Sequence, residues 1–454
     1  MTLPITLVFK GNGNKDLANS LVSDLNNSTL VEGLNFKFAI KTSADLKDGY
    51  SFNIYFDLIE DQDWTYFSKY VAYLGEDKYI AVKVSKDTSE NIQRLKALIT
   101  DVLLDTHVLD ILIKREAGKA MDSRQLDYMT PKFQRKYIWE SASLARLYNI
   151  QIVFIKNSVR ASSNQHKERS ILNAVTKFAD KFKDSTKLKI TVENLYGLGI
   201  EQFITTDISG RRFIHTGTTM EKLMTLVDQH ISSSLSVKPL LKLVILETDE
   251  QFVFVDDQEE DVPGTIAASW GSAIPLVLYD QHKQVDEYQN ELKTVTSFLF
   301  GSVKILLGMQ ADILSVYQKS SQPLLLWEMQ RFHLRAFVDN LLTSIHHIKS
   351  TQALIDKIEY IVINEDIANR TNFAISLIQK AIHQLETTGH LDVETVSLAA
   401  QIAESVSNDP SLTSMLYFDN DAKFAVYLPI GMPILLPVFI TLYDMVRKRI
   451  GKKL

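Results

Sequence analysis

The chain contains no cysteine in its 454 residues. It can therefore form no disulfide, no thiolate zinc site and no thioester intermediate. It also has no excess of positive charge, because 55 acidic residues outnumber 49 basic ones and the net charge is −6. A chain without a basic field is not expected to bind nucleic acid.

Motifs with a catalytic meaning are missing as well. The sequence has no GxSxG nucleophile elbow, no HExxH metal-binding helix and no GxxxxGK[ST] phosphate loop. The acidic run from Asp256 to Asp261 lacks the alternating spacing and central glycine of a calcium loop, so we expect a solvated hairpin tip there. We therefore predict no catalytic residue, no cofactor and no metal site.

The two ends of the chain differ in hydrophobicity. The first residues, MTLPITLVFKGNGNKD, have only a short apolar run that ends at Lys10, which is too short for a signal or an anchor. Residues 424–443, by contrast, read FAVYLPIGMPILLPVFITLY and carry no charge. At about 1.5 Å per residue they can cross a hydrocarbon layer of roughly 30 Å. We predict a C-terminal transmembrane helix here, in preference to a buried core helix.

Three prolines, Pro429, Pro433 and Pro437, recur at every fourth position of this segment. Proline has no N–H, so three carbonyl groups along one side of the helix lose their donors. Lipid cannot replace those hydrogen bonds, whereas neighbouring helices, hydroxyl groups or water can. The pattern predicts a span that docks in a membrane assembly; a kinked anchor without a partner is the alternative.

A basic tail follows the span and consists of Arg447, Lys448, Arg449, Lys452 and Lys453. The flank on the other side, with Asp419, Asp421 and Lys423, is slightly acidic. The positive-inside rule then places the C-terminus in the cytoplasm and the body in a lumen. Because such a body needs an N-terminal signal, we expect either that Met1 is not the native start or that the chain is tail-anchored with a cytosolic body.

Short β-branched runs alternate with helical patterns up to residue 280, and an almost wholly helical pattern follows. The predicted strands are 5–9, 36–40, 52–56, 79–84, 150–155, 188–192 and 243–246, and helices are predicted at 91–112, 166–182 and 219–231. Such alternation predicts an α/β layered body with a mixed sheet, followed by a long-helix segment and one C-terminal transmembrane helix. We detect no internal repeat.

These patterns divide the chain into four predicted parts: an α/β lumenal body (1–280), a helical lumenal segment (281–415), a juxtamembrane turn with the transmembrane helix (416–446) and a basic cytoplasmic tail (447–454). Sequons for N-glycosylation begin at Asn26, Asn27 and Asn369. These three asparagines are candidate glycosylation sites if the body is lumenal.

Four collinear stretches resemble the PIG-S family, the S subunit of GPI transamidase. They are LYFDNDAKFAVYLPIGMPILLP (416–437), ASWGS (268–272), WEMQR (327–331) and IVINEDIA (361–368). The resemblance covers the chain well from about Tyr148 onward and only loosely before it. The family's N-terminal membrane span has no counterpart here, which favours a truncated or mis-started chain.

The resemblance implies a non-catalytic subunit of the complex that attaches GPI anchors to precursor proteins in the endoplasmic reticulum membrane. Its implied partners are the other transamidase subunits, including a cysteine-protease-like catalytic subunit, with the GPI lipid and the precursor as further candidates. Two alternatives stay open: a tail-anchored cytosolic α/β enzyme such as a lipid hydrolase, and a tethering adaptor that uses its long helices in a coiled coil.

Overall fold

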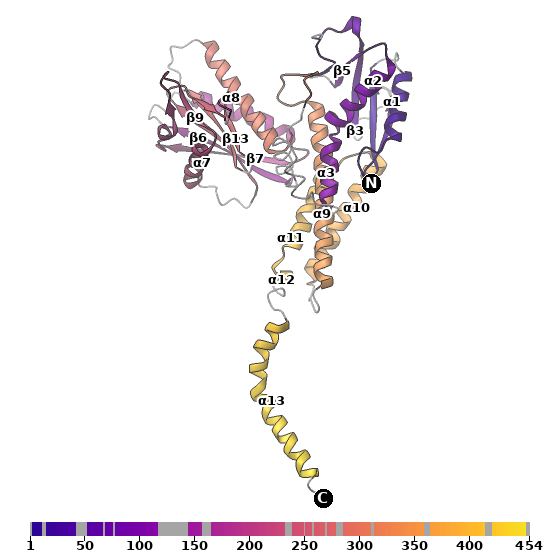
Figure 1. The fold of residues 1–454 in the computed structure, drawn as a ribbon, viewed down its shortest axis with the longest axis vertical. Helices are drawn as coiled ribbons and strands as arrows, with labels where there is room; N and C mark the ends of the chain where they lie inside the picture. The colour runs from indigo at the N-terminus through magenta and orange to yellow at the C-terminus, as the bar shows by residue number, and fades with distance from the viewer. Residues whose placement is uncertain are drawn as a thin grey trace.

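The computed structural model describes residues 2–10, 15–41, 52–66, 69–75, 78–116, 144–156, 165–231, 238–248, 250–256, 258–267, 270–277, 285–309, 313–357, 364–413 and 420–450. Two α/β lobes lie side by side at one end of a bundle of long helices, and a separate helix extends from the other end (Figure 1). The predicted order of an α/β body with mixed sheets, then long helices and a terminal apolar helix, is confirmed.

The first lobe is built on a six-stranded sheet of order β15-β4-β5-β3-β1-β2. Its strands are β1 (Thr2–Phe9), β2 (Asn35–Lys41), β3 (Phe52–Glu60), β4 (Ala72–Leu74), β5 (Tyr79–Val84) and β15 (Tyr317–Lys319). Strand β1 pairs in parallel with β2 and β3, and β3 pairs in parallel with β5, whereas β4 is antiparallel to β5. Helices α1 (Lys15–Asn27), α2 (Thr88–Ala97) and α3 (Thr106–Glu116) belong to this lobe.

The second lobe is built on a five-stranded sheet of order β13-β14-β10-β6-β7. Its strands are β6 (Leu147–Lys156), β7 (Lys187–Tyr196), β10 (Leu240–Thr248), β13 (Thr265–Ala267) and β14 (Gly271–Val277). Successive side chains of β6 point to opposite faces of the sheet, and each face belongs to a different hydrophobic core. Ile152 and Phe154 pack toward α6 (Gln165–Ala179) and α8 (Val285–Leu306), and Val153 and Ile155 pack toward α7 (Thr218–His230).

The two sheets have the same strand order. If the strands of each unit are numbered in chain order, they lie in space in the order 4-5-3-1-2. Strand 4 is antiparallel to strand 5 in both units. The units correspond as β1 to β6, β2 to β7, β3 to β10, β4 to β13 and β5 to β14, and in each a helix, α1 or α6, connects the first two strands. The chain thus contains a duplicated unit that the sequence did not reveal.

The copies differ in two segments of the second lobe, one between β7 and β10 and one between β10 and β13. Only the second lobe carries, among the described residues, a small sheet of order β12-β11-β9-β8. Its strands are β8 (Thr205–Thr206), β9 (Arg212–His215), β11 (Val253–Val255) and β12 (Asp261–Val262). The acidic run lies in the β11–β12 hairpin, where Asp256 Oδ1 accepts hydrogen bonds from the N–H groups of Gln258 and Glu260, both at 2.9 Å. The expectation of a hairpin tip is confirmed; Asp257 lies outside the described residues.

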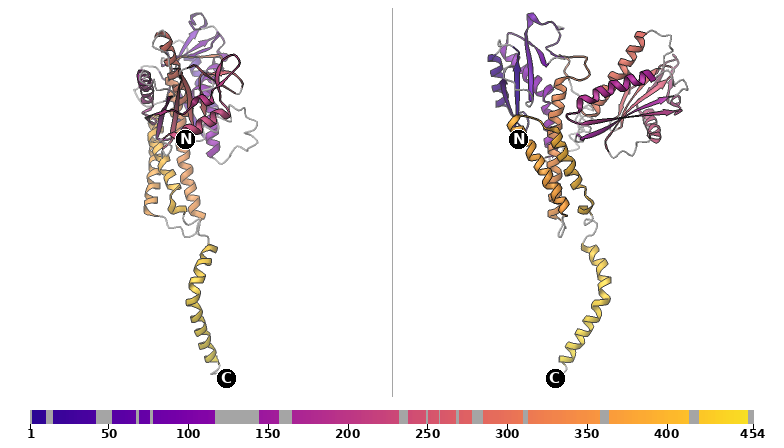
Figure 2. Two further views of the ribbon diagram at one scale, coloured as in Figure 1. Left: turned by 90° about the vertical axis from the view of Figure 1, so that its left-hand side faces the viewer. Right: turned by 180° about the vertical axis from the view of Figure 1, so that it is seen from behind.

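Three antiparallel helices, α9 (Leu326–Lys357), α10 (Glu365–Thr388) and α11 (Val393–Ser407), form the bundle (Figure 2). Gly389 adopts a left-handed conformation (φ 72°) that ends α10, and the side chain of Asp392 accepts a hydrogen bond from Thr395 N at the start of α11. Apolar residues of α9 that a coiled coil would need lie inside the chain: Leu334, Val338 and Leu341 are buried. These residues are therefore not available for a coiled coil with a partner.

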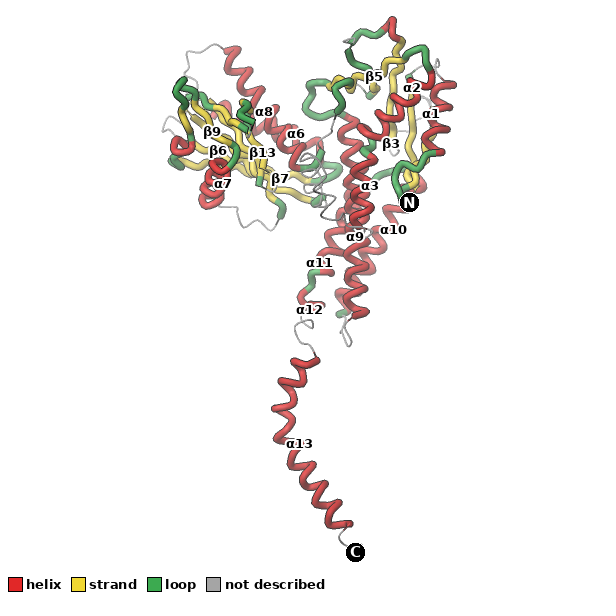
Figure 3. The backbone as a smooth tube through the Cα atoms, viewed as in Figure 1, coloured by secondary structure: helices red, strands yellow, loops and turns green. Residues whose placement is uncertain are grey.

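The predicted helix 91–112 is interrupted in the structure. A π-helical stretch, Leu98–Leu103, follows α2, and Asp105 then adopts φ 52° before α3 begins. Helix α8, which the sequence assigned to the separate helical segment, packs with α6 on the second sheet (Figure 3). The division of the chain at residue 280 stays a prediction.

Candidate functional site

The terminal helix α13 (Asn420–Ile450) contains the one candidate membrane span among the residues that the structure describes. Its segment Phe424–Arg447 is long and apolar enough to span a bilayer, and none of this segment is buried in the protein. Figure 3 shows it as a continuous helix that stands apart from the bundle and bends along its length. A core helix would be covered by the body, so its exposure favours a membrane environment.

The three predicted docking prolines, Pro429, Pro433 and Pro437, all lie inside α13. Each removes the donor for the carbonyl four residues earlier, which explains a bend at this point. On the tail side, the hydroxyl of Thr441 donates to the carbonyl of Pro437 at 2.8 Å. Of the basic tail, Arg447 lies on the described helix, Lys448 and Arg449 are described only as helical backbone, and Lys452 and Lys453 lie outside the described residues.

The candidate sequons are placed differently from one another. Asn26 uses both ends of its carboxamide: it accepts from Phe38 N at 2.9 Å and donates to Phe38 O at 3.1 Å. Asn27, the last residue of α1, and Asn369, near the start of α10, are exposed. All three asparagines are thus exposed, but the carboxamide of Asn26 is engaged in hydrogen bonds to the backbone of β2.

One pair of side chains resembles part of a hydrolase triad. Ser185 Oγ lies 2.6 Å from Nε2 of His333. Burial lowers the pKa of His333 to about 4, although the nearby charge of Asp184 opposes this, so the imidazole is neutral at pH 7. Ser185 is only 4% exposed, and the pocket between β3, β5 and the start of α9 is lined by other residues, among them Tyr55, Trp327 and Gln330.

This Ser–His pair joins the second lobe to the bundle. Ser185 follows the short 3-10 turn Asp180–Phe182, and the ring of Phe182 packs edge-on against Phe332, the neighbour of His333, with centroids 6.0 Å apart. We call Phe182, Ser185, Phe332 and His333 the interlobe joint. A buried hydroxyl held there can fix the position of the lobes, but a substrate cannot reach it.

Segment 327–331, which carried the sequence resemblance, forms a second anchor. Glu328 is buried and accepts hydrogen bonds from Lys304 Nζ of α8 at 2.6 Å, from Lys319 of β15 and from Leu325 N at 3.0 Å. Leu325 precedes α9, and Glu328 is the third residue of that helix. The bond from Leu325 N to the Glu328 carboxylate is therefore one of the two hydrogen bonds of a capping box. Burial alone would raise the pKa of Glu328, but the two lysines reverse the shift and lower that pKa.

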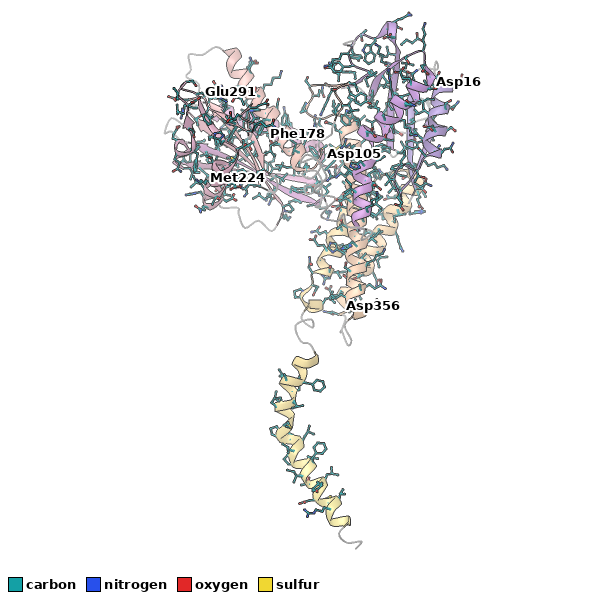
Figure 4. All side chains as sticks on the ribbon, in the orientation of Figure 1. Asp16, Asp105, Phe178, Met224, Glu291 and Asp356 are labelled. Carbon is teal, nitrogen blue, oxygen red and sulfur yellow. The ribbon has the colours of Figure 1, made fainter. Side chains whose placement is uncertain are left out.

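Arg331 completes this anchor on the side of the first lobe. It donates to Val102 O at 3.0 Å and pairs with the carboxylate of Asp105, which Figure 4 labels at the junction of α3 and α9. Both side chains are almost fully buried. The pair explains why Asp105 interrupts the predicted helix: a buried guanidinium holds its carboxylate in place.

Within the described ranges, no group of three or more His, Asp or Glu side chains lies where it could hold a metal ion. The interlobe joint and the anchor at 327–331 were not found from sequence. Their contacts join residues far apart in the chain, and no short motif records them. Only the buried charges in WEMQR could have pointed to one of them.

Comparison with known proteins now gives the family. The model of the family described as "PIG-S: Phosphatidylinositol-glycan biosynthesis class S protein" matches residues 12–452. The chain belongs to the PIG-S family. The match includes both lobes, the bundle and α13, so the likeness that the sequence indicated only loosely before Tyr148 extends into the first lobe.

Individual members of the PIG-S family are similar at modest identity. The Bos taurus protein named GPI-anchor transamidase component PIGS is 27% identical over 229 residues, which are 47% of this chain and 41% of the bovine protein. The Homo sapiens protein of the same name is 35% identical over 127 residues, 27% of this chain and 22% of the human protein. Each alignment thus spans less than half of the relative.

Proposed function

We propose that the chain is a non-catalytic subunit of the GPI transamidase complex, which attaches GPI anchors to precursor proteins in the endoplasmic reticulum. The observation that carries this proposal is the family match from residue 12 to residue 452, together with the printed name of the relatives, GPI-anchor transamidase component. The chain has no cysteine that could form a thioester, so a cysteine-protease-like partner would supply catalysis.

The subunit would act by assembly. Helix α13 would dock among other membrane helices along its proline-bearing side, and the two lobes would stand in the lumen on the bundle. The exposed positions of Asn27 and Asn369 and the basic residues after the span support a lumenal body with a cytoplasmic C-terminus. The GPI lipid and the precursor protein are further proposed partners of the assembly.

The lipid hydrolase alternative rests on the Ser185–His333 pair. A nucleophile must reach its substrate, and Ser185 is buried in the interlobe joint. A histidine whose pKa is about 4 is also a weak base at neutral pH. The geometry therefore favours a structural role for the pair.

The test is a complementation experiment in cells depleted of the chain. Surface display of a GPI-anchored reporter should fall on depletion and return with the wild-type chain, which should co-isolate with the cysteine-protease-like subunit from membranes. The Ser185→Ala variant should restore display to the same degree. Failure of the wild-type chain to co-isolate with that subunit would refute the assembly role, and a folded Ser185→Ala variant without activity would revive the enzyme.

A further inference from the structure

The duplicated units differ at the edges of their sheets. In the first lobe, β15 pairs in parallel with β4 and covers that edge. At the opposite edge, the carboxamide of Asn26 bonds both the N–H and the C=O of Phe38, in the middle of β2. One edge of the first sheet is thus a strand of only three residues, and the other is bonded by a side chain of the same chain; both features limit the binding of other strands to an edge.

Strand β7 of the second lobe, the counterpart of β2, has no such cover among the described residues. The N–H groups of Lys187 and Gly197 donate to carbonyls on the β6 side, at 3.0 and 3.2 Å. Because a strand alternates its hydrogen-bonding direction, the odd-numbered residues of β7 face β6. The even-numbered ones, which are Leu188, Ile190, Val192, Asn194 and Tyr196, direct their N–H and C=O groups to the free edge.

This free edge is accessible along its length. No residue of β7 is buried, whereas the neighbouring strand β6 is buried over most of its length. Val192 is 46% exposed and Tyr196 is 62% exposed. At ten residues, β7 is also much longer than the short edge strands that avoid pairing.

The charge along the edge is uneven. Residues 177–189, which lead into β7, include five lysines and two aspartates in a chain whose net charge is −6. Lys181, Lys183, Lys187 and Lys189 are all exposed. The far end of the strand, residues 192–196, has no basic residue and includes the acidic Glu193, and Tyr196 lies beneath the ammonium of Lys156 at 5.7 Å from the ring centroid. A strand that fits this edge carries acidic residues beside the lysine-rich end.

We infer that the free edge of β7 binds an extended segment of another subunit of the assembly, which adds a sixth strand to the second sheet. Backbone hydrogen bonds to the even-numbered residues of β7 would supply most of the affinity, and acidic side chains beside Lys187 and Lys189 would set the direction of the added strand. This inference rests on the proposed function, because it takes the partner from the same complex.

Proline substitutions test the backbone pairing directly. Val192→Pro and Asn194→Pro each remove an N–H that faces the free edge and leave the ladder with β6 intact. Val192→Ala keeps the N–H and removes the side chain. Ile40→Pro is the matched control, because Ile40 faces outward on β2, two residues from Phe38, at an edge that Asn26 already occupies.

The chain is isolated from membranes in the complex and alone, and amide exchange is followed residue by residue across 187–197. We expect exchange at the even-numbered residues to slow at least tenfold in the complex, with odd-numbered residues protected in both states. A photo-crosslinker at Tyr196 should label another subunit, and either β7 proline variant should abolish this label while Val192→Ala and Ile40→Pro keep it. Protected odd-numbered amides show that a variant is folded.

The outcomes separate this inference from the proposed function. If the wild-type chain co-isolates with the cysteine-protease-like subunit but the even-numbered amides exchange equally fast in both states, strand addition is wrong and the assembly role stands. A crosslink to a second copy of the chain also overturns the inference. If the wild-type chain does not co-isolate with that subunit, the proposed function fails first.

Discussion

Nε2 of His333, on the first long helix of the bundle, lies 2.6 Å from Oγ of Ser185, which belongs to the second lobe and is 148 positions away in the chain. A neutral imidazole is what this contact requires, because the site is buried. The same pair therefore couples the position of the second lobe to the protonation state of one histidine.

Acid should weaken the fold through His333. Its pKa is about 4 in the folded chain and near 6.5 when unfolded, so the unfolded chain takes up a proton first as the pH falls. The stability supplied by neutral His333 is complete above pH 6.5 and is lost toward pH 4, with a loss of about 2 kcal/mol between pH 7 and pH 5. Denaturant titrations of the full chain in detergent should show a smaller pH dependence for His333→Gln. His230→Gln, at an exposed position on α7, should keep the wild-type slope.

Removing the partner of Arg331 should be costly. In Asp105→Gly the glycine accepts the left-handed conformation, so the main loss is the carboxylate that pairs with the buried guanidinium of Arg331 and also accepts from Val108 N at 3.4 Å, about 3–5 kcal/mol. Adding Arg331→Met should recover part of this loss in the free energy of unfolding. Glu259→Gly, at an exposed residue with φ 62°, should change stability by less than about 0.5 kcal/mol. If Asp105→Gly and the combination of Asp105→Gly with Arg331→Met were equally stable, the buried guanidinium would not be the source of the loss.

Straightening α13 should weaken assembly without unfolding the body. Pro433→Leu combined with Pro437→Leu restores two backbone donors and removes two of the three prolines that account for the bend. We expect a several-fold loss of co-isolated subunits and an unchanged melting temperature of the lobes. Ile434→Leu combined with Val438→Leu changes as many residues of the same helix and should have no effect. Full co-isolation by the proline variant would show that the bend has no role in docking.

Glycosylation should depend on two of the three sequons. Asn27→Gln leaves the sequon of Asn26 intact, yet it should remove one glycosidase-sensitive step in gel mobility, because the carboxamide of Asn26 is bonded to Phe38. Asn369→Gln should remove a second step. Asn26→Gln should leave both steps and lower the melting temperature. A body without any glycosidase-sensitive step would argue against a lumenal location.

Local patterns predicted most elements of this fold. All seven predicted strands lie within observed ones, because β-branched runs were bounded by turn residues and every one of these strands except β7 has buried residues on at least one face. The helix 91–112 was predicted without its break, because the cause is Arg331, 226 positions away from Asp105. Propensity and periodicity carry no information about a contact of that range.

The site could be predicted only in its membrane part. The hydrophobicity and the regular prolines of the terminal segment are visible in a continuous run of residues, so α13 could be located from sequence. The interlobe joint could not, because Ser185 and His333 are ordinary residues until the fold brings them together. The duplication was also hidden, because the two units share strand order but differ in their inserted segments, and repeated topology leaves no repeated sequence.

The length of α9 separates the lobes from α13. Its 32 residues extend over about 48 Å, and its start lies against the first lobe, where Gln330 donates to Asn53 O and Arg331 donates to Val102 O. Its other end lies on the side of the bundle from which α13 extends (Figure 2). The bundle is thus a stalk between the two lobes and the terminal helix.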